Sequence, residues 1–152
     1  MKRGPDTVRA GFTLVELILA VAVLAILVSI TIPRIGWGTM GKVQAETAAR
    51  KFSDHLKLAR SLAITHASSN SSGYKVVLSG PFTSYSVINV VTSEVVKGPI
   101  DIPEGVTCSG DDEFHFTPLG QLQGGSTLTV QFLKSGDATV VTATAVGRIT
   151  VG

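Results

Sequence analysis

The sequence predicts an α+β protein in which a long N-terminal helix precedes a domain of antiparallel sheets. Three features lead to this prediction: a continuous apolar segment near the start, an amphipathic segment directly after it, and a series of short β-type segments in the second half. The apolar fraction of the whole chain, 44%, is raised by the first of these features. With 152 residues, the chain has room for one folded domain besides the apolar segment.

The apolar segment covers residues 12–32 and contains a single acidic residue, Glu16. At a rise of about 1.5 Å per residue, it would be roughly 30 Å long as a helix, which matches the hydrocarbon core of a bilayer. We therefore expect residues 12–35 to form a membrane-spanning helix.

The first eleven residues form a polar, basic leader, with Lys2, Arg3 and Arg9 against Asp6. This positive charge is expected to keep the leader on the cytoplasmic side of the membrane. A secretory signal peptide is cut behind its apolar core, whereas the only suitable cleavage position here lies in front of it, after Gly11. The apolar segment is therefore expected to remain on the mature chain.

Glu16 stands out because an ionised carboxylate inside hydrocarbon costs about 3 kcal/mol or more unless it has a partner. Cleavage after Gly11 would create a free ammonium on Phe12, one helical turn from Glu16. The two groups could pair within one chain or between neighbouring chains. In the alternative interpretation, Glu16 lies near the membrane edge and reaches the head groups.

Pro33 directly follows the apolar segment, and we expect it to kink or end the helix because it removes a helical hydrogen bond. An amphipathic helix is predicted for about residues 39–65, within a globular domain that covers residues 36–152. Its apolar face recurs at spacings of three and four residues: Ala45, Ala48, Phe52, Leu56, Ala59 and Ala63. The charged residues between them are expected to form a solvated face.

The β-rich part is predicted for residues 73–152, where glycine-containing turns separate short segments of β-type composition. The expected strands are 74–78, 85–91, 94–97, 106–108, 113–117, 127–133, 139–145 and 148–151. Alternation such as Leu128, Val130 and Phe132 against polar neighbours gives each sheet one apolar face. We expect the amphipathic helix to cover those faces, in a sandwich-like arrangement of sheets.

The residues Gly-Phe-Thr-Leu-Val-Glu at 11–16 resemble the type III signal of type IV prepilins and type II secretion pseudopilins. The resemblance implies that a prepilin peptidase cuts after Gly11 and methylates Phe12. It also implies a pilin-like fold and a role for Glu16 in docking subunits into a helical filament. One departure is Ala10, since the family often has Lys or Arg directly before the glycine.

Four further segments resemble the GspH/FimT family of minor pseudopilins and minor pilins: Ala59-Arg60-Ser61-Leu62-Ala63, Gly73-Tyr74-Lys75-Val76-Val77, Phe116-Thr117-Pro118-Leu119-Gly120 and Gly147-Arg148-Ile149-Thr150-Val151. This resemblance implies a minor pseudopilin of a type II secretion system, a structural subunit of the periplasmic pseudopilus that drives protein export. It would be a single-pass protein of the bacterial inner membrane with its C-terminal domain in the periplasm. The implied partners are other pseudopilins or pilins, the prepilin peptidase, the inner-membrane assembly platform and membrane lipid.

The alternative is a FimT-like minor type IV pilin involved in pilus assembly or DNA uptake, with Arg148 as a candidate DNA contact. The 13 Lys and Arg residues less the three of the leader leave ten, and the 11 Asp and Glu residues less one also leave ten. A neutral mature chain with one arginine at the candidate contact argues against nucleic acid as a partner.

The sequence does not predict an enzyme or a cofactor. It contains no nucleophile beside a base, no phosphate-binding glycine loop and no paired cysteines, and His55 and His66 are too far apart on a helix to share a metal ion. The acidic cluster Asp111, Asp112 and Glu113 could bind calcium, as some related pseudopilins do. Its spacing follows no calcium-loop pattern, which favours a solvated loop.

Overall fold

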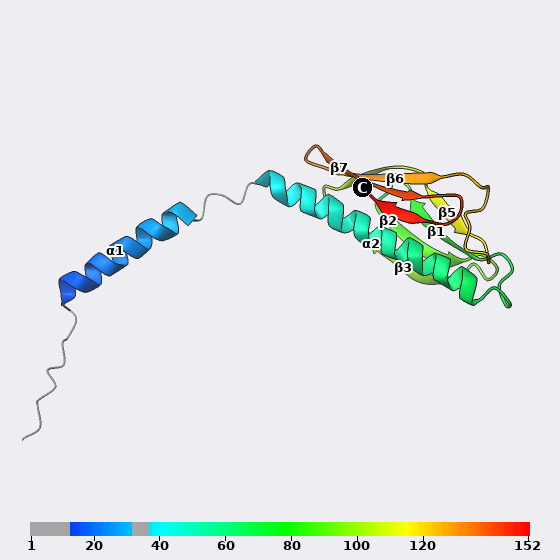
Figure 1. Cartoon of the computed structure of the whole chain (residues 1–152), viewed down its shortest axis with the longest axis horizontal. Helices are drawn as coiled ribbons and strands as arrows, with labels where there is room; N and C mark the ends of the chain where they lie inside the picture. The colour runs from blue at the N-terminus through cyan, green and yellow to red at the C-terminus, as the bar shows by residue number, and fades with distance from the viewer. Residues whose placement is uncertain (1–12, 32–36) are drawn as a thin grey trace, which may run out of the picture. The chain divides into compact units, whose positions relative to one another are not determined.

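The computed structural model describes residues 13–31 and 37–152. The chain divides into two compact units, one that ends at Gly36 and one from Trp37 to Gly152. The described residues form two helices and eight strands (Figure 1).

The first unit contains α1 (Leu14–Thr31), an apolar helix of 18 residues. Thr13 caps its first turn, because the Thr13 hydroxyl accepts a hydrogen bond from the backbone N–H of Glu16 at 3.3 Å. Large apolar residues are exposed on all sides of the helix, from 49% at Val23 to 73% at Leu14. Within residues 13–31 and 37–152, no helix meets the combined requirements of length and apolarity for crossing a membrane. The predicted kink at Pro33 lies outside the described residues.

The second unit opens with α2 (Trp37–Thr65), which starts two residues before the predicted position and ends where predicted. Its buried face consists of Ala45, Ala48, Ala49, Phe52, Ser53, Leu56, Ala59 and Ala63. The exposed face carries two ion pairs, Glu46 with Arg50 at 2.7 Å and Asp54 with Lys57 at 3.1 Å. The amphipathic pattern of the sequence is therefore confirmed, with the charged side in solvent.

Two antiparallel sheets of four strands follow α2. The first has the order β3-β2-β1-β5 and consists of β1 (Tyr74–Ser79), β2 (Ser84–Asn89), β3 (Val95–Asp101) and β5 (Glu113–Phe116). The second has the order β4-β6-β7-β8 and consists of β4 (Thr107–Gly110), β6 (Leu128–Lys134), β7 (Asp137–Ala143) and β8 (Ile149–Val151). Every pair of neighbouring strands is antiparallel.

The core lies between α2 and the inner faces of both sheets, as Figure 1 shows for the helix that runs along them. Phe52 of α2 is its centre: its ring lies 5.0 Å from Tyr85 and 5.6 Å from Phe114, both of the first sheet. It also lies 5.6 Å from Phe132 of the second sheet. One helix thus covers both apolar sheet faces, and the predicted α+β class is confirmed.

β3 extends beyond its predicted end at residue 97 and continues through Gly98 and Pro99 to Asp101. Pro99 cannot donate a hydrogen bond to a strand ladder. β3 is an edge strand, so the missing donor can face away from its neighbour. The strand has a bulge at Gly98 and Pro99: Val87 pairs with Lys97 and Tyr85 with Ile100, so two residues of β3 lie opposite one residue of β2.

Candidate functional site

The two residues expected to be processed, Gly11 and Phe12, lie outside the described part of the chain. Glu16, the expected assembly residue, is exposed in the first turn of α1, with its backbone N–H bound to the Thr13 hydroxyl. The Thr-x-x-Glu spacing is that of a capping box, so residues 13 and 16 also have a local role in starting the helix. The Thr-x-x-Glu spacing in the sequence signals this role of Thr13.

Three of the four short segments that resemble the GspH/FimT family meet at one place in the structure. Arg60, on α2, donates a hydrogen bond from Nε to the backbone carbonyl of Gly120 at 2.9 Å. Gly147 lies against the same carbonyl, and a Cβ atom at residue 147 would overlap the Gly120 oxygen and lie 2.7 Å from Arg60 Nε. Gly147 has a φ of +80°, which side chains rarely adopt. These contacts join the helix, the turn after β5 and the turn before β8.

The turn between β7 and β8 is held by its own hydrogen bonds. Gly147 donates to the Thr144 carbonyl at 2.7 Å, and the backbone N–H of Arg148 donates to the Thr144 hydroxyl at 3.1 Å. The N–H of Leu122 also donates to the Ala145 carbonyl at 3.0 Å. The turn is therefore fixed to its surroundings, while Arg148 remains exposed.

Arg148 lines a surface pocket of about 530 Å³ together with Lys57 and Arg60 from α2. A smaller pocket of about 120 Å³ shares Lys57 and is also lined by Arg50, Asp54, Ser53 and Val151. We call the two together the basic groove; it runs between α2 and β8. Lys57 pairs with Asp54, but the Arg148 guanidinium has no partner among the residues that the structure describes.

The structure thus places two cations, Lys57 and Arg60, beside Arg148, which the sequence alone does not bring together. Lys57 and Arg60 are three residues apart and share a helix face, which the sequence does signal. Nothing local in the sequence indicates that this face lies beside the turn before β8. That proximity depends on the contact of Gly147 with the Gly120 carbonyl.

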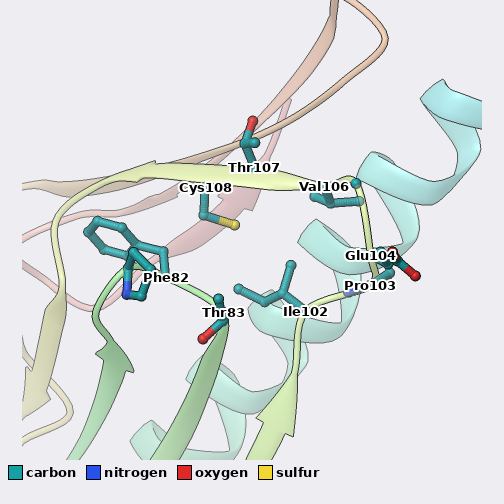
Figure 2. A pocket seen from close by; sticks show the side chains of 10 residues that line it. Phe82, Thr83, Ile102, Pro103, Glu104, Val106, Thr107 and Cys108 are labelled. Atoms are coloured by element: carbon teal, nitrogen blue, oxygen red, sulfur yellow. The ribbon is translucent and has the colours of Figure 1, made fainter.

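A different pocket, of about 400 Å³, opens between the loop at residues 81–83, the loop at residues 102–106 and the start of β4. Figure 2 shows Ile102 and the Cys108 sulfur pointing into the same space, with the Glu104 carboxylate directed away. Burial raises the pKa of the Cys108 thiol to about 11, so it stays protonated at neutral pH. This pocket offers apolar contact and no reactive thiolate.

The histidines occupy separate places. His55 Nδ1 and the Tyr85 hydroxyl share a hydrogen bond of 2.9 Å, as do His66 Nδ1 and the Tyr74 hydroxyl. His115 Nε2 donates to the Ser72 carbonyl. Burial lowers the pKa of His55, and the positive charge of Lys97 lowers it further.

The acidic cluster at residues 111–113 is engaged in local bonds. The Asp111 carboxylate accepts a hydrogen bond from the N–H of Thr129 at 2.6 Å. Glu113 pairs with Lys75 at 3.0 Å. Within the two described stretches, no group of three or more His, Cys, Asp or Glu residues is arranged to hold a metal ion.

Comparison with known proteins bears on both units of the chain. Residues 7–32 match the family described as the prokaryotic N-terminal methylation motif. No curated protein matches the sequence at a significant level.

Solved structures of two proteins resemble the chain. One is the type IV minor pilin FimU of Pseudomonas aeruginosa, with 16% identity and a TM-score of 0.57 over 70% of this chain and 86% of FimU. A second crystal form of FimU gives 19% identity and a TM-score of 0.55 over 70% and 90%. The other is the minor pseudopilin EpsH of the Type 2 Secretion System of Vibrio cholerae, with 13% identity and a TM-score of 0.57 over 72% and 96%. At these identities the likeness shows a shared fold.

Proposed function

We propose that this chain, which carries the prokaryotic N-terminal methylation motif and the fold of minor pilins and pseudopilins, is a structural, non-enzymatic filament subunit. The observation that carries the proposal is the joining of the motif at residues 7–32 to an exposed apolar helix and a pilin-like domain. A helix that is apolar on all sides needs a covering, which lipid or neighbouring helices can supply.

The proposed course begins with insertion of residues 12–35 into the inner membrane, with the leader in the cytoplasm and residues 36–152 in the periplasm. The prepilin peptidase then cuts after Gly11 and methylates Phe12. In the filament, the apolar helices of neighbouring subunits replace lipid around one another. Glu16, in the first turn of α1, pairs with the new ammonium of a neighbour and so lowers the cost of leaving the membrane.

The machine we propose is a type II secretion system, in which the chain acts as a minor pseudopilin. The similarity to EpsH supports this choice. The partners would be other pseudopilins, bound through α1, and the inner-membrane assembly platform.

The alternative is a FimT-like minor type IV pilin that acts in pilus assembly or DNA uptake. The similarity to FimU supports a pilus role to the same degree. The observation that favours a DNA contact is that Arg148 has Lys57 and Arg60 beside it in one pocket. Three cations at one place can neutralise more phosphates than the single arginine visible in the sequence.

Mass spectrometry of the chain purified from cells that contain a prepilin peptidase tests the processing step. We expect a mature polypeptide that begins at a methylated Phe12. A chain that still begins at Met1 in such cells would contradict the proposal. To separate the two machines, a strain without the chain is compared with its parent: retention of normally exported proteins in the periplasm identifies secretion, and loss of twitching or DNA uptake identifies the pilus.

A further inference from the structure

β8 is an edge strand, and its free edge borders the basic groove. Among the strands of residues 37–152, it pairs with β7 alone, at the end of the order β4-β6-β7-β8. Gly152 exchanges two backbone hydrogen bonds with Val140, and the Arg148 carbonyl accepts one from Thr144. Since bonded and non-bonded pairs alternate in an antiparallel ladder, the N–H and C=O groups of Ile149 and Val151 point away from β7. They form a short template for another strand.

The groove beside that edge is positively charged. Its lining contains Arg50, Lys57, Arg60 and Arg148. Glu46 pairs with Arg50 and Asp54 pairs with Lys57, which leaves Arg60 and Arg148 without a carboxylate partner among the described residues. Ile149 lines the larger pocket and Val151 the smaller one, so the free strand edge and the cations belong to the same surface. A chain that lies along β8 would therefore have cations beside its side chains.

Ser53 gives an independent indication that something binds here. The residue is 1% exposed and lines the smaller pocket. Its hydroxyl has no hydrogen-bond partner within the described part of the chain. Buried hydroxyl groups are normally bonded, so this one is suited to a ligand that reaches the floor of the groove.

We propose that the basic groove and the free edge of β8 bind an extended acidic segment of a neighbouring pilin-like subunit, which adds a strand to β8. The proposal rests on the proposed function for the identity of the neighbour. Strand addition uses backbone hydrogen bonds for affinity and side-chain contacts for selectivity. An acidic peptide satisfies the strand edge, the cations and the Ser53 hydroxyl, whereas a nucleic acid offers no backbone that matches the edge of β8.

The test uses the full chain in non-ionic detergent micelles and a fluorescein-labelled peptide of alternating glutamate and valine with blocked ends. Fluorescence anisotropy measures its binding. Three comparison probes have one property changed: the same peptide with alternate backbone nitrogens methylated, a peptide with lysine in place of glutamate, and an oligothymidine of equal charge. The first removes backbone donors, the second reverses charge, and the third represents nucleic acid.

We expect saturable binding of the acidic peptide and weaker binding of all three comparison probes. Arg148→Glu and Lys57→Glu should each weaken peptide binding by about tenfold or more, because the charges attract across a partly desolvated groove. Lys51→Glu is the matched control: it makes the same charge change on α2, at a residue that lines a different pocket. Ser53→Ala should weaken binding without lowering stability, since it removes a hydroxyl that has no partner in the free protein.

Three results would overturn the proposal: no saturable binding of the acidic peptide, equal binding of the backbone-methylated peptide, or binding of oligothymidine alone. Circular dichroism of each variant separates lost binding from lost folding. The assay requires no filament, so its failure leaves assembly through α1 intact. Conversely, a chain that fails to assemble because of a change in α1 should still bind the peptide.

Discussion

His55 is the side chain whose charge state depends most directly on the packing of α2 against the first sheet. It shares a hydrogen bond with the buried Tyr85, and burial together with Lys97 lowers the pKa of His55 below its ordinary value of 6.5. Burial also raises the pKa of Tyr85 to about 12, so that its hydroxyl stays protonated at neutral pH. The pair is therefore neutral in the folded chain at pH 7 and above.

The lowered pKa of His55 predicts a loss of stability on mild acidification. As the pH falls below about 6.5, the unfolded chain binds a proton at this residue before the folded chain does. The contribution of neutral His55 to the free energy of unfolding is complete above pH 6.5, the ordinary pKa, and is lost as the pH falls through the lower pKa of the folded state. We expect the urea midpoint to fall between pH 7.5 and pH 5, and to fall less in His55→Gln. Parallel pH profiles for the two proteins would show that His55 has no part in the effect.

For individual residues, the sequence reveals those whose role depends on close neighbours in the chain. Glu16 is visible because an acid interrupts an apolar segment, and Gly11 and Phe12 because they precede that segment. Lys57 and Arg60 could not be connected with Arg148, because their proximity depends on a contact between turns about 27 residues apart, near Gly120 and Gly147. Sequence periodicity carries no information about such contacts.

The helices and strands were predictable to the extent that each has its own hydrophobic period. α2 was found from its three-and-four spacing and the strands of both sheets from alternation and turn residues, with ends that differ by a few residues. β3 runs past its predicted end at residue 97 through Gly98 and Pro99, a pair that is tolerable there because β3 lies at the sheet edge.

The turn before β8 offers a prediction about how an element is fixed in place. Gly147→Ala forces a Cβ atom into the Gly120 carbonyl and against Arg60, at a residue with φ +80°. Gly124→Ala is a matched control, because Gly124 has a φ of +88° and nothing within 4 Å of a built Cβ atom. Both changes carry the backbone cost of about 1 kcal/mol that a side chain incurs at positive φ.

Only Gly147→Ala adds the steric overlap, so we expect it to lower the free energy of unfolding by about 2 kcal/mol more than Gly124→Ala does. Urea unfolding of both variants and of the parent chain measures the difference. Hydrogen exchange should show faster exchange in β8 and its turn for Gly147→Ala alone. Equal effects of the two substitutions would mean that the turn yields to the added atom and does not anchor β8.

For the whole molecule, the fold class followed from counting apolar faces. One amphipathic helix and two sets of half-apolar strands can bury those faces only by packing the helix against the sheets, and Phe52 contacts both sheets in this way. The order of the strands could not be predicted. β1 pairs with β5 and β4 with β6, and these long-range pairings leave no pattern in any short stretch of sequence.

Glu16 has two roles that experiment can separate, one in capping α1 and a proposed one in attracting a neighbouring subunit. Its backbone N–H donates to the Thr13 hydroxyl and so forms part of the helix cap. Its carboxylate is proposed to pair with the ammonium of a processed neighbour. Glutamine suits the same capping position but carries no charge. We expect Glu16→Gln and Glu16→Ala to be cleaved and inserted normally but to enter the filament poorly.

Thr13→Ala is the complementary variant, because it removes the cap at a cost of about 1 kcal/mol and leaves the Glu16 charge in place. We expect Thr13→Ala to assemble at a level close to that of the parent chain. Immunoblots of sheared filaments and of the membrane fraction measure incorporation and insertion separately. The reverse pattern, with Glu16→Gln assembling and Thr13→Ala failing, would assign the pair to helix capping. The carboxylate would then have no part in attracting a neighbouring subunit.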